Sequence, residues 1–283
     1  MSKKYTEQED TFKKDELASR QAHPEEGKRQ ISWFHPFGPI IIKSTISDEL
    51  HKILLTVAEQ LRNGTHPNKD INTKTNDFRN HLAGNLTEEY SYEGAFSVID
   101  DMLIQNELTG LAAMFTKIAG DAGVVEKNGE MVLQPEDIFL GRPLWVNFMK
   151  SGEWNPAHNH SGDISCVMYL QVPPEILEEN KTSAHASKSN SPTAGCLEFQ
   201  FGNNGMQYCT GNFGRLPKVK DIYMFPAQLA HQVYPFQSQV ERVSVSCNFA
   251  TYKGLKVYKD GTPGKKDPEH LFGDAPNAKL GGD

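Results

Sequence analysis

The sequence predicts a mainly β protein, a sandwich or closed barrel with an N-terminal layer of helices packed against it. Two observations lead to this fold class. Apolar residues recur with the helical period of 3.6 in the first half of the chain and with the strand period of two after about residue 131. Clusters of Gly, Pro and Asn separate the strand-like segments, as the turns between antiparallel strands require.

Two helical regions are expected in the first half. In the segment 44–64 the apolar residues follow one helical face, and Asn63-Gly64 provides an ending. A second stretch, 95–119, also has apolar residues suited to a buried stripe, and it forms either one helix or two helices divided near Gly110.

The second half alternates between apolar and polar residues in short segments. Polar loops are expected at 178–194 and at 203–217, where Gly, Asn, Ser and Lys dominate. The expected strands are Leu144–Lys150, Ile164–Val172, Cys196–Phe201, Asp221–Phe225, Ala230–Pro235 and Glu241–Thr251.

Composition divides the chain into four parts. Residues 1–30 are rich in Lys, Glu, Asp and Gln and are expected to form a disordered arm. Residues 31–130 are expected to be the helical layer and 131–255 the β core. Residues 256–283, rich in Gly, Pro and Lys, are expected to be a flexible tail.

Charge and composition exclude several classes of protein. The net charge of −7 and the lack of a basic block argue against nucleic-acid binding. No apolar run approaches the roughly 20 residues that span a bilayer, and no signal peptide is evident at the N-terminus. The four cysteines lack CxxC spacing, which favours reduced thiols in the cytoplasm.

Three histidines of the second half are candidate metal ligands. His158 and His160, in the string WNPAHNHSGD, are two residues apart, so on an extended segment both imidazoles point to one face. His231 follows in FPAQLAHQVYP, on a distant strand. Three such ligands fit a metal site that keeps positions open for substrate, although an HxH pair standing alone also arises by chance on a surface.

The last expected strand, ERVSVSCNF, has a polar face that begins with Arg242 and Ser244. A guanidinium and a hydroxyl that point the same way are suited to binding a carboxylate. An ordinary strand with one solvated face accounts for the same alternation, so the residues alone leave both interpretations open.

Together these motifs resemble a known enzyme family. The strings WVNFMKSGEWNPAHNHSGDISCVMYLQVP and IYMFPAQLAHQVYPF…ERVSVSCNF are similar to those of a 2-oxoglutarate/Fe(II) oxygenase family known largely from tailed bacteriophages of marine bacteria. The resemblance extends from about Trp145 to Thr251 and implies a double-stranded β-helix, or jelly roll. It also implies an Fe(II) site, 2-oxoglutarate as co-substrate, and, if the chain is encoded by a phage, activity in the host cytoplasm.

The resemblance implies that His158, His160 and His231 are the catalytic metal ligands and that Arg242 and Ser244 bind the distal carboxylate of 2-oxoglutarate. The usual motif of this superfamily has an acid at the position of His160. Asp163 or, upstream, Glu153 could supply that acid, and Asp163 is the alternative third ligand. Asn147 and Tyr169 are weaker candidates for contacts with 2-oxoglutarate or with the substrate, since either can be a structural polar group instead.

The expected reaction is hydroxylation of an unidentified small-molecule or protein substrate, with release of succinate and CO2. Two other functions remain open. A cupin-like metalloprotein would not use 2-oxoglutarate and would not need Arg242 as a carboxylate anchor. A non-catalytic jelly-roll module would show no iron-dependent oxygen consumption. The sequence gives no indication of the oligomeric state.

Overall fold

The computed structural model describes residues 31–34, 38–81, 84–121, 138–141, 143–182, 192–202 and 211–251. The expected arm at 1–30, the start of the β core at 131–137 and the expected tail at 256–283 lie outside these residues. No described helix is long and apolar enough to cross a membrane.

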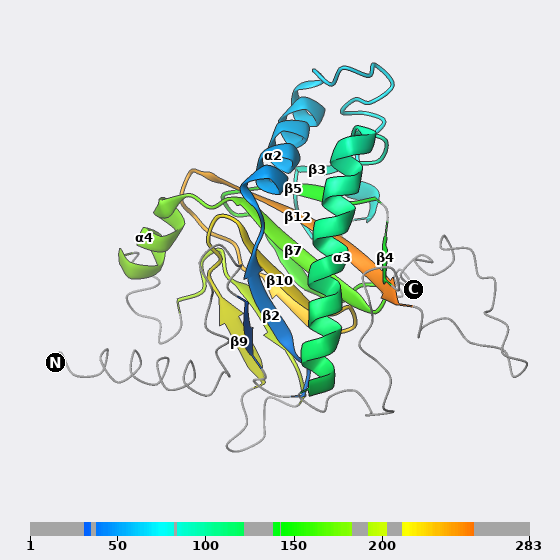
Figure 1. The fold of residues 1–283 in the computed structure, drawn as a ribbon. Helices are drawn as coiled ribbons and strands as arrows, with labels where there is room; N and C mark the ends of the chain where they lie inside the picture. Colours follow the sequence, from blue (N-terminus) through cyan, green and yellow to red (C-terminus); the bar gives the residue numbers. More distant parts are fainter. Residues whose placement is uncertain are drawn as a thin grey trace, which may run out of the picture.

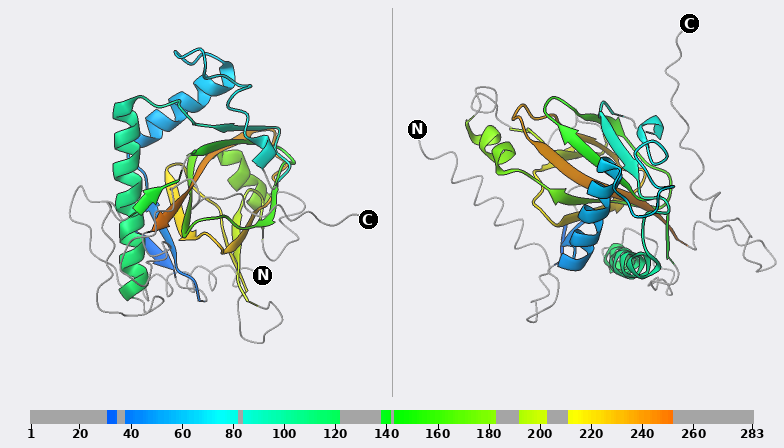
Figure 2. Two further views of the ribbon diagram at one scale, coloured as in Figure 1. Left: turned by 90° about the vertical axis from the view of Figure 1, so that its right-hand side faces the viewer. Right: turned by 90° about the horizontal axis from the view of Figure 1, so that it is seen from above.

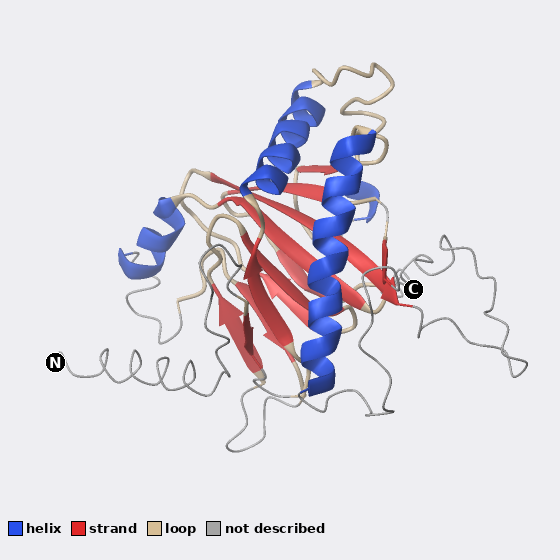
Figure 3. Cartoon of the chain, in the orientation of Figure 1, coloured by secondary structure: helices blue, strands red, loops and turns tan. Residues whose placement is uncertain are grey.

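Two antiparallel sheets dominate the fold (Figure 1 and Figure 3). The strands are β1 (Ser32–Phe34), β2 (Ile41–Thr45), β3 (Glu88–Ser91), β4 (Ile138–Leu140), β5 (Trp145–Lys150), β6 (Asn155–His158), β7 (Ile164–Gln171), β8 (Leu197–Gln200), β9 (Asn212–Arg215), β10 (Asp221–Pro226), β11 (Ala230–Val233) and β12 (Glu241–Thr251). The larger sheet has the order β1-β2-β10-β7-β12-β5-β3, with β4 also paired to β12. The smaller sheet has the order β6-β11-β8-β9. This arrangement is the predicted double-stranded β-helix, in which the two sheets face each other.

The helices are α2 (Asp48–Asn63), α3 (Val98–Asp121), α4 (Pro174–Thr182) and the short 3-10 helix η1 (Arg79–His81). Helix α2 begins at Ser47, whose hydroxyl accepts a hydrogen bond from the Leu50 amide, and it ends at Gly64 with φ of +64°. Both features satisfy backbone groups that a helix end leaves unpaired. Helix α3 continues through Gly110 without a break, so the single-helix alternative is correct.

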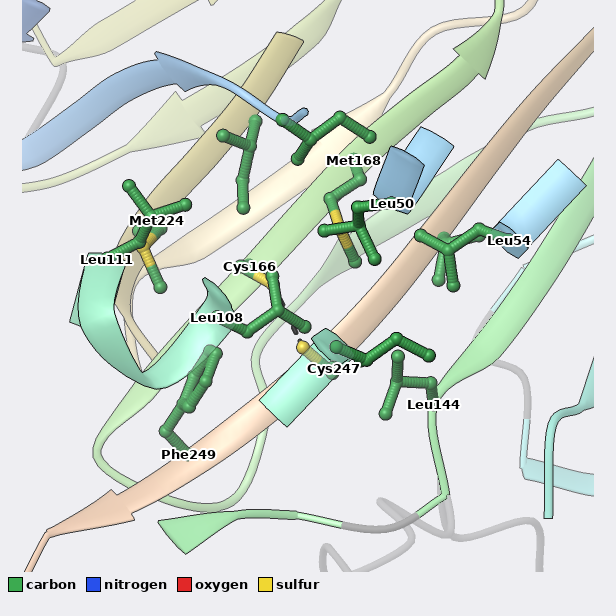
Figure 4. Packing of buried hydrophobic residues seen from close by; sticks show 14 of the residues in the cluster. Leu50, Leu54, Leu108, Leu111, Leu144, Cys166, Met168, Met224, Cys247 and Phe249 are labelled. Atoms are coloured by element: carbon green, nitrogen blue, oxygen red, sulfur yellow. Dashed lines mark hydrogen bonds between the residues drawn. The ribbon is translucent and has the colours of Figure 1, made fainter. Parts of the chain in front are cut away.

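The large sheet has different neighbours on its two faces. Leu54 of α2 and Leu108 of α3 pack with the face that carries Val245, Cys247 and Phe249 (Figure 4). The opposite face packs with apolar side chains of the small sheet, among them Phe199. The two long helices therefore cover the outside of the large sheet (Figure 2), as the alternation of β12 predicts.

The sequence predicts a helical layer for residues 31–130, but this segment is not purely helical. It also contributes β1 and β2 at one edge of the large sheet and β3 at the other. Strand β2 pairs with β10 and β3 with β5, so their partners lie far along the chain. Short segments of this kind show little periodicity of their own, because the pairing itself stabilises them. The loops expected at 178–194 and 203–217 likewise contain the end of α4 and strand β9.

Candidate metal centre and carboxylate site

Three histidines meet at the small sheet. His158 ends β6 and His231 lies on β11, where the two residues are directly opposite each other. His160 follows two residues after His158, and the distances between ring centroids are 4.3 Å for His158 and His231 and 5.0 Å for each of the other pairs. One potential ligand nitrogen from each ring lies within 4.8 Å of the others. This is the one group of three metal-binding side chains among the described residues.

Hydrogen bonds to the backbone orient two of the rings. Nδ1 of His158 lies 2.7 Å from the carbonyl oxygen of Pro156, and Nδ1 of His231 lies 2.9 Å from that of Leu229. A carbonyl oxygen only accepts, so Nδ1 carries the proton in each ring and Nε2 keeps a lone pair. Metal-binding histidines are commonly held by such a bond through the other ring nitrogen.

The position of His160 depends on contacts between two loops. Its amide donates to the carbonyl oxygen of Ala227, and the amide of Ala227 donates to that of Asp163. The ring of Trp145, on β5, lies 5.7 Å from the His160 ring between centroids. These contacts connect the loop after β6 with the loop before β11 and with the large sheet.

Burial favours the neutral form of all three imidazoles. It lowers the pKa of His231 to about 3, with a further contribution from His158. Burial also lowers the pKa of His158, and that of His160 falls well below its usual value because of burial and then of the two neighbouring histidines. A neutral imidazole is the form that binds a metal ion, so the cluster is suited to metal binding near neutral pH.

Asp163, the alternative third ligand, lies outside this cluster. Its Oδ2 accepts hydrogen bonds from the backbone amide of Thr251 at 2.7 Å and from the Thr251 hydroxyl at 2.9 Å. The carboxylate of Asp163 therefore connects the start of β7 to the end of β12.

Arg242 and Ser244 lie on the face of β12 that points between the sheets. Arg242 is 2% exposed, and one of its terminal nitrogens donates to the carbonyl oxygen of Gly195 at 3.0 Å. Its Nε is buried without a hydrogen-bond partner, and no carboxylate among the described residues pairs with it. Burial lowers the pKa of Arg242. A buried guanidinium with unused donors is suited to an anionic ligand, because leaving it unpaired is costly.

The weaker candidates, Asn147 and Tyr169, lie beside Ser244. Asn147 is its register partner on β5, and Tyr169 is its partner on β7. The guanidinium carbon of Arg242 lies 5.5 Å from the centre of the Tyr169 ring, and burial raises the pKa of Tyr169 to about 12. Oδ1 of Asn147 is buried and has no hydrogen-bond partner. Both side chains thus border the position proposed for the carboxylate.

Two further residues on this face or next to it are not predicted by the sequence. Glu89 of β3 is the register partner of Asn147; it is 2% exposed, and its Oε2 has no hydrogen-bond partner. Gly195 has φ of +67°, a conformation that favours glycine, and presents its carbonyl to Arg242. Neither the acid in EEYS nor the glycine in its loop is distinguished by the local sequence, because contacts with residues far along the chain place Glu89 and Gly195 here.

Residues 143–248 match the family model described as "Putative 2OG-Fe(II) oxygenase". The match includes all of the predicted ligand and carboxylate-binding residues. A search of curated proteins found no match.

Solved structures with a similar arrangement of the chain include three enzymes. A prolyl-4-hydroxylase of Pseudomonas putida has 12% identity and a TM-score of 0.38, with 74% of this chain and 91% of that chain covered. SnoK, an alpha-ketoglutarate-dependent carbocyclase from nogalamycin biosynthesis, has 9% identity and a TM-score of 0.48, with 83% and 92% covered. A prolyl hydroxylase of Trichoplax adhaerens has 11% identity and a TM-score of 0.39, with 76% and 84% covered.

At these TM-scores the likeness to solved structures is weak, and the family match carries the assignment of the enzyme class. That match falls on the segment in which the histidine cluster and the buried Arg242 lie between the two sheets. On the strength of this match to residues 143–248, the protein is an Fe(II)- and 2-oxoglutarate-dependent dioxygenase.

Proposed function

We propose that the protein hydroxylates a C–H bond of an unidentified small-molecule or protein substrate, with release of succinate and CO2. In this proposal His158, His160 and His231 bind Fe(II). The observation that supports it most strongly is the combination of a neutral three-histidine cluster with a buried guanidinium that has no acidic partner among the described residues. The cluster suits the metal, and the guanidinium suits a carboxylate.

Arg242 and Ser244 are proposed to bind the distal carboxylate of 2-oxoglutarate. The planar guanidinium offers several N–H donors, and the Ser244 hydroxyl is a further donor on the same face of β12. The Gly195 carbonyl holds one of those donors in place before the ligand binds. Tyr169 and Asn147 are proposed to complete this end of the site, since they flank Ser244 on the two neighbouring strands.

In this proposal, side chains of the protein hold the metal, exclude water and align the co-substrate. The histidines orient the metal through nitrogens that backbone bonds leave available, and the two sheets exclude water from the interior. Arg242 and Ser244 align the co-substrate with respect to the histidine cluster. Fe(II), when bound with 2-oxoglutarate and dioxygen, supplies the oxidising chemistry itself.

His160 rather than Asp163 is proposed as the third ligand. Asp163 already accepts two hydrogen bonds from Thr251, so recruiting it to the metal would break both. A triad of neutral ligands also leaves the charge of Fe(II) uncompensated, and that favours binding of the dianionic 2-oxoglutarate.

A cupin-like metalloprotein that does not use 2-oxoglutarate is the competing function for this geometry. It would account for the histidine cluster but not for the buried Arg242. Anaerobic titration with Fe(II) and then with 2-oxoglutarate distinguishes the two, because the chelate has a weak visible charge-transfer band. We expect the band in the wild-type protein and its loss at the same 2-oxoglutarate concentration in Arg242→Ala. Normal iron binding without any band would support the cupin-like function instead.

Succinate formation is the second measurement. We expect Fe(II)-dependent succinate release from 2-oxoglutarate in the presence of dioxygen, slowly without substrate and faster with the correct one. His231→Ala should abolish it. Iron and co-substrate binding without any succinate release would contradict the proposed reaction and leave a binding protein.

The cytoplasm is the proposed location. The four cysteines lack CxxC spacing, which favours reduced thiols and supports a reducing compartment. A phage origin, and with it the host cytoplasm, is a proposal that only the sequence resemblance supports. No partner other than the substrate is proposed.

A further inference from the structure

Two cysteines lie opposite each other on the central strands of the large sheet. Cys166 of β7 and Cys247 of β12 are register partners, and their Sγ atoms are 3.0 Å apart. They are 1% and 0% exposed, and Leu108 of α3 lies close by in the same cluster (Figure 4). Both point away from the site, because Arg242 and Ser244 occupy the other face of β12.

The backbone at this pair already meets the requirement of a disulfide. Directly opposite residues in an antiparallel pair have Cα atoms about 4.5 or 5.5 Å apart, and disulfides occur at Cα separations of about 4.4–6.8 Å. Bond formation needs an approach of the two sulfurs by roughly 1 Å, to about 2.05 Å, and side-chain rotation supplies a movement of this size. The positions are 81 residues apart in the chain, so only the folded sheet brings them together.

From this geometry we propose that Cys166 and Cys247 are a redox-active pair, which forms a β7–β12 disulfide with a disulfide oxidant such as oxidised glutathione. This modification lies outside the iron site and does not depend on the proposed function. The disulfide would link β7, which carries Tyr169, covalently to β12, which carries Ser244.

The reaction is a pair of thiol–disulfide exchanges. One cysteine loses its proton and attacks a sulfur of oxidised glutathione, which expels one glutathione thiolate that takes up a proton. The second cysteine then loses its proton and attacks the protein sulfur of the mixed disulfide. The Cys166–Cys247 bond forms, the second glutathione leaves and is protonated, and the two electrons lost by the protein reduce one oxidised glutathione to two thiols.

Burial determines when the pair reacts. Helices α2 and α3 cover this face of the sheet, so an oxidant reaches the thiols when the helices move away or before they have packed. Oxidation of the native protein should therefore be slow and should accelerate in urea below the unfolding transition. Oxidation during refolding should be fast, because strand pairing places one thiol beside the mixed disulfide on the other.

The test is refolding of the full chain in glutathione buffers of increasing oxidised fraction, followed by acid quenching, alkylation and peptide mapping. We expect a peptide linking Cys166 to Cys247, with the mass of two hydrogens lost, at ratios where Cys196 gives only mixed disulfide. The linked protein should unfold at higher urea than the reduced protein, since the cross-link restricts the unfolded chain. Cys196→Ala is the matched control and should keep the link, whereas Cys166→Ala and Cys247→Ala should each lose it.

Native protein incubated with oxidised glutathione in low urea gives a second measurement that does not require refolding. The proposal is overturned if both experiments leave Cys166 and Cys247 fully alkylated at the most oxidising ratio. It is also overturned if links to Cys196 or Cys209 form as readily as the Cys166–Cys247 link.

Discussion

His158 and His231 face each other across the β6–β11 pair with their ring centroids 4.3 Å apart. Each ring is fixed by a hydrogen bond from Nδ1 to the backbone carbonyl two residues earlier in the chain. Replacing either by Ala should reduce Fe(II) affinity by more than the roughly 10–100-fold that loss of an outer hydrogen bond costs. Anaerobic Fe(II) titration measures this, and circular dichroism should show that the sheets persist.

The choice between His160 and Asp163 has its own pair of variants. His160→Ala should weaken Fe(II) binding as strongly as His231→Ala does. Asp163→Asn should leave iron binding unchanged and lower only the stability, because it weakens the bonds to Thr251. The reverse pattern in the same titration would identify Asp163 as the ligand.

The co-substrate prediction concerns the shape of the guanidinium. Arg242→Lys keeps a positive charge but loses the two parallel N–H donors, so it should weaken 2-oxoglutarate binding more than Ser244→Ala does. Arg242→Ala should cost several kcal/mol of binding free energy, roughly the penalty for an unpaired buried carboxylate. Iron binding should be unchanged in all three. Equal 2-oxoglutarate affinity in wild type and Arg242→Ala, measured by the charge-transfer band, would refute the anchor.

Glu89 should make the protein less stable as the pH rises. Burial, with a smaller contribution from Asp77, raises the pKa of its carboxyl from 4.5 to about 8 in the folded protein. Between these values the folded state holds a proton that the unfolded chain has released. The free energy of unfolding therefore falls by about 1.4 kcal/mol per pH unit in this window, and the loss is complete above it.

Glu89→Gln is the variant that tests this linkage. It keeps the shape and removes the titration, so its unfolding free energy should vary less with pH between 5 and 8, the two profiles differing by up to a few kcal/mol at the alkaline end. Urea unfolding at several pH values measures both. Parallel profiles would mean that Glu89 is ionised in the folded protein.

The alternation of β12 gives a stability prediction. Val245 is fully buried under the helices, whereas the neighbouring Ser246 is only half-buried and faces between the sheets. Val245→Ala should lower the free energy of unfolding by about 1–3 kcal/mol, because it removes buried methyl groups and leaves a cavity. Ser246→Ala is the matched control on the opposite face and should change stability by less than about 1 kcal/mol. Equal losses of unfolding free energy in the two variants would contradict the assignment of Val245 to the helix-covered face of β12 and of Ser246 to the opposite face.

Local patterns were sufficient for the parts of the protein whose spacing repeats. The period of two predicted β12 over Glu241–Thr251 and its polar face, and the period of 3.6 predicted helices in the regions of α2 and α3. The HxH spacing predicted that the imidazoles of His158 and His160 lie on one side of a strand end. The Arg-x-Ser spacing predicted that Arg242 and Ser244 lie on one face of another strand. These features depend on neighbours in the chain, so the sequence by itself determined them.

Tertiary structure alone decided what depends on residues far apart. It added β2 and β3 to opposite edges of the large sheet, placed Glu89 beside Asn147, and brought the Gly195 carbonyl to Arg242. It also set His158 opposite His231 and Cys166 opposite Cys247. Register between strands comes from the summed burial and hydrogen bonding of whole sheets, and that sum is not contained in the spacing of any one segment.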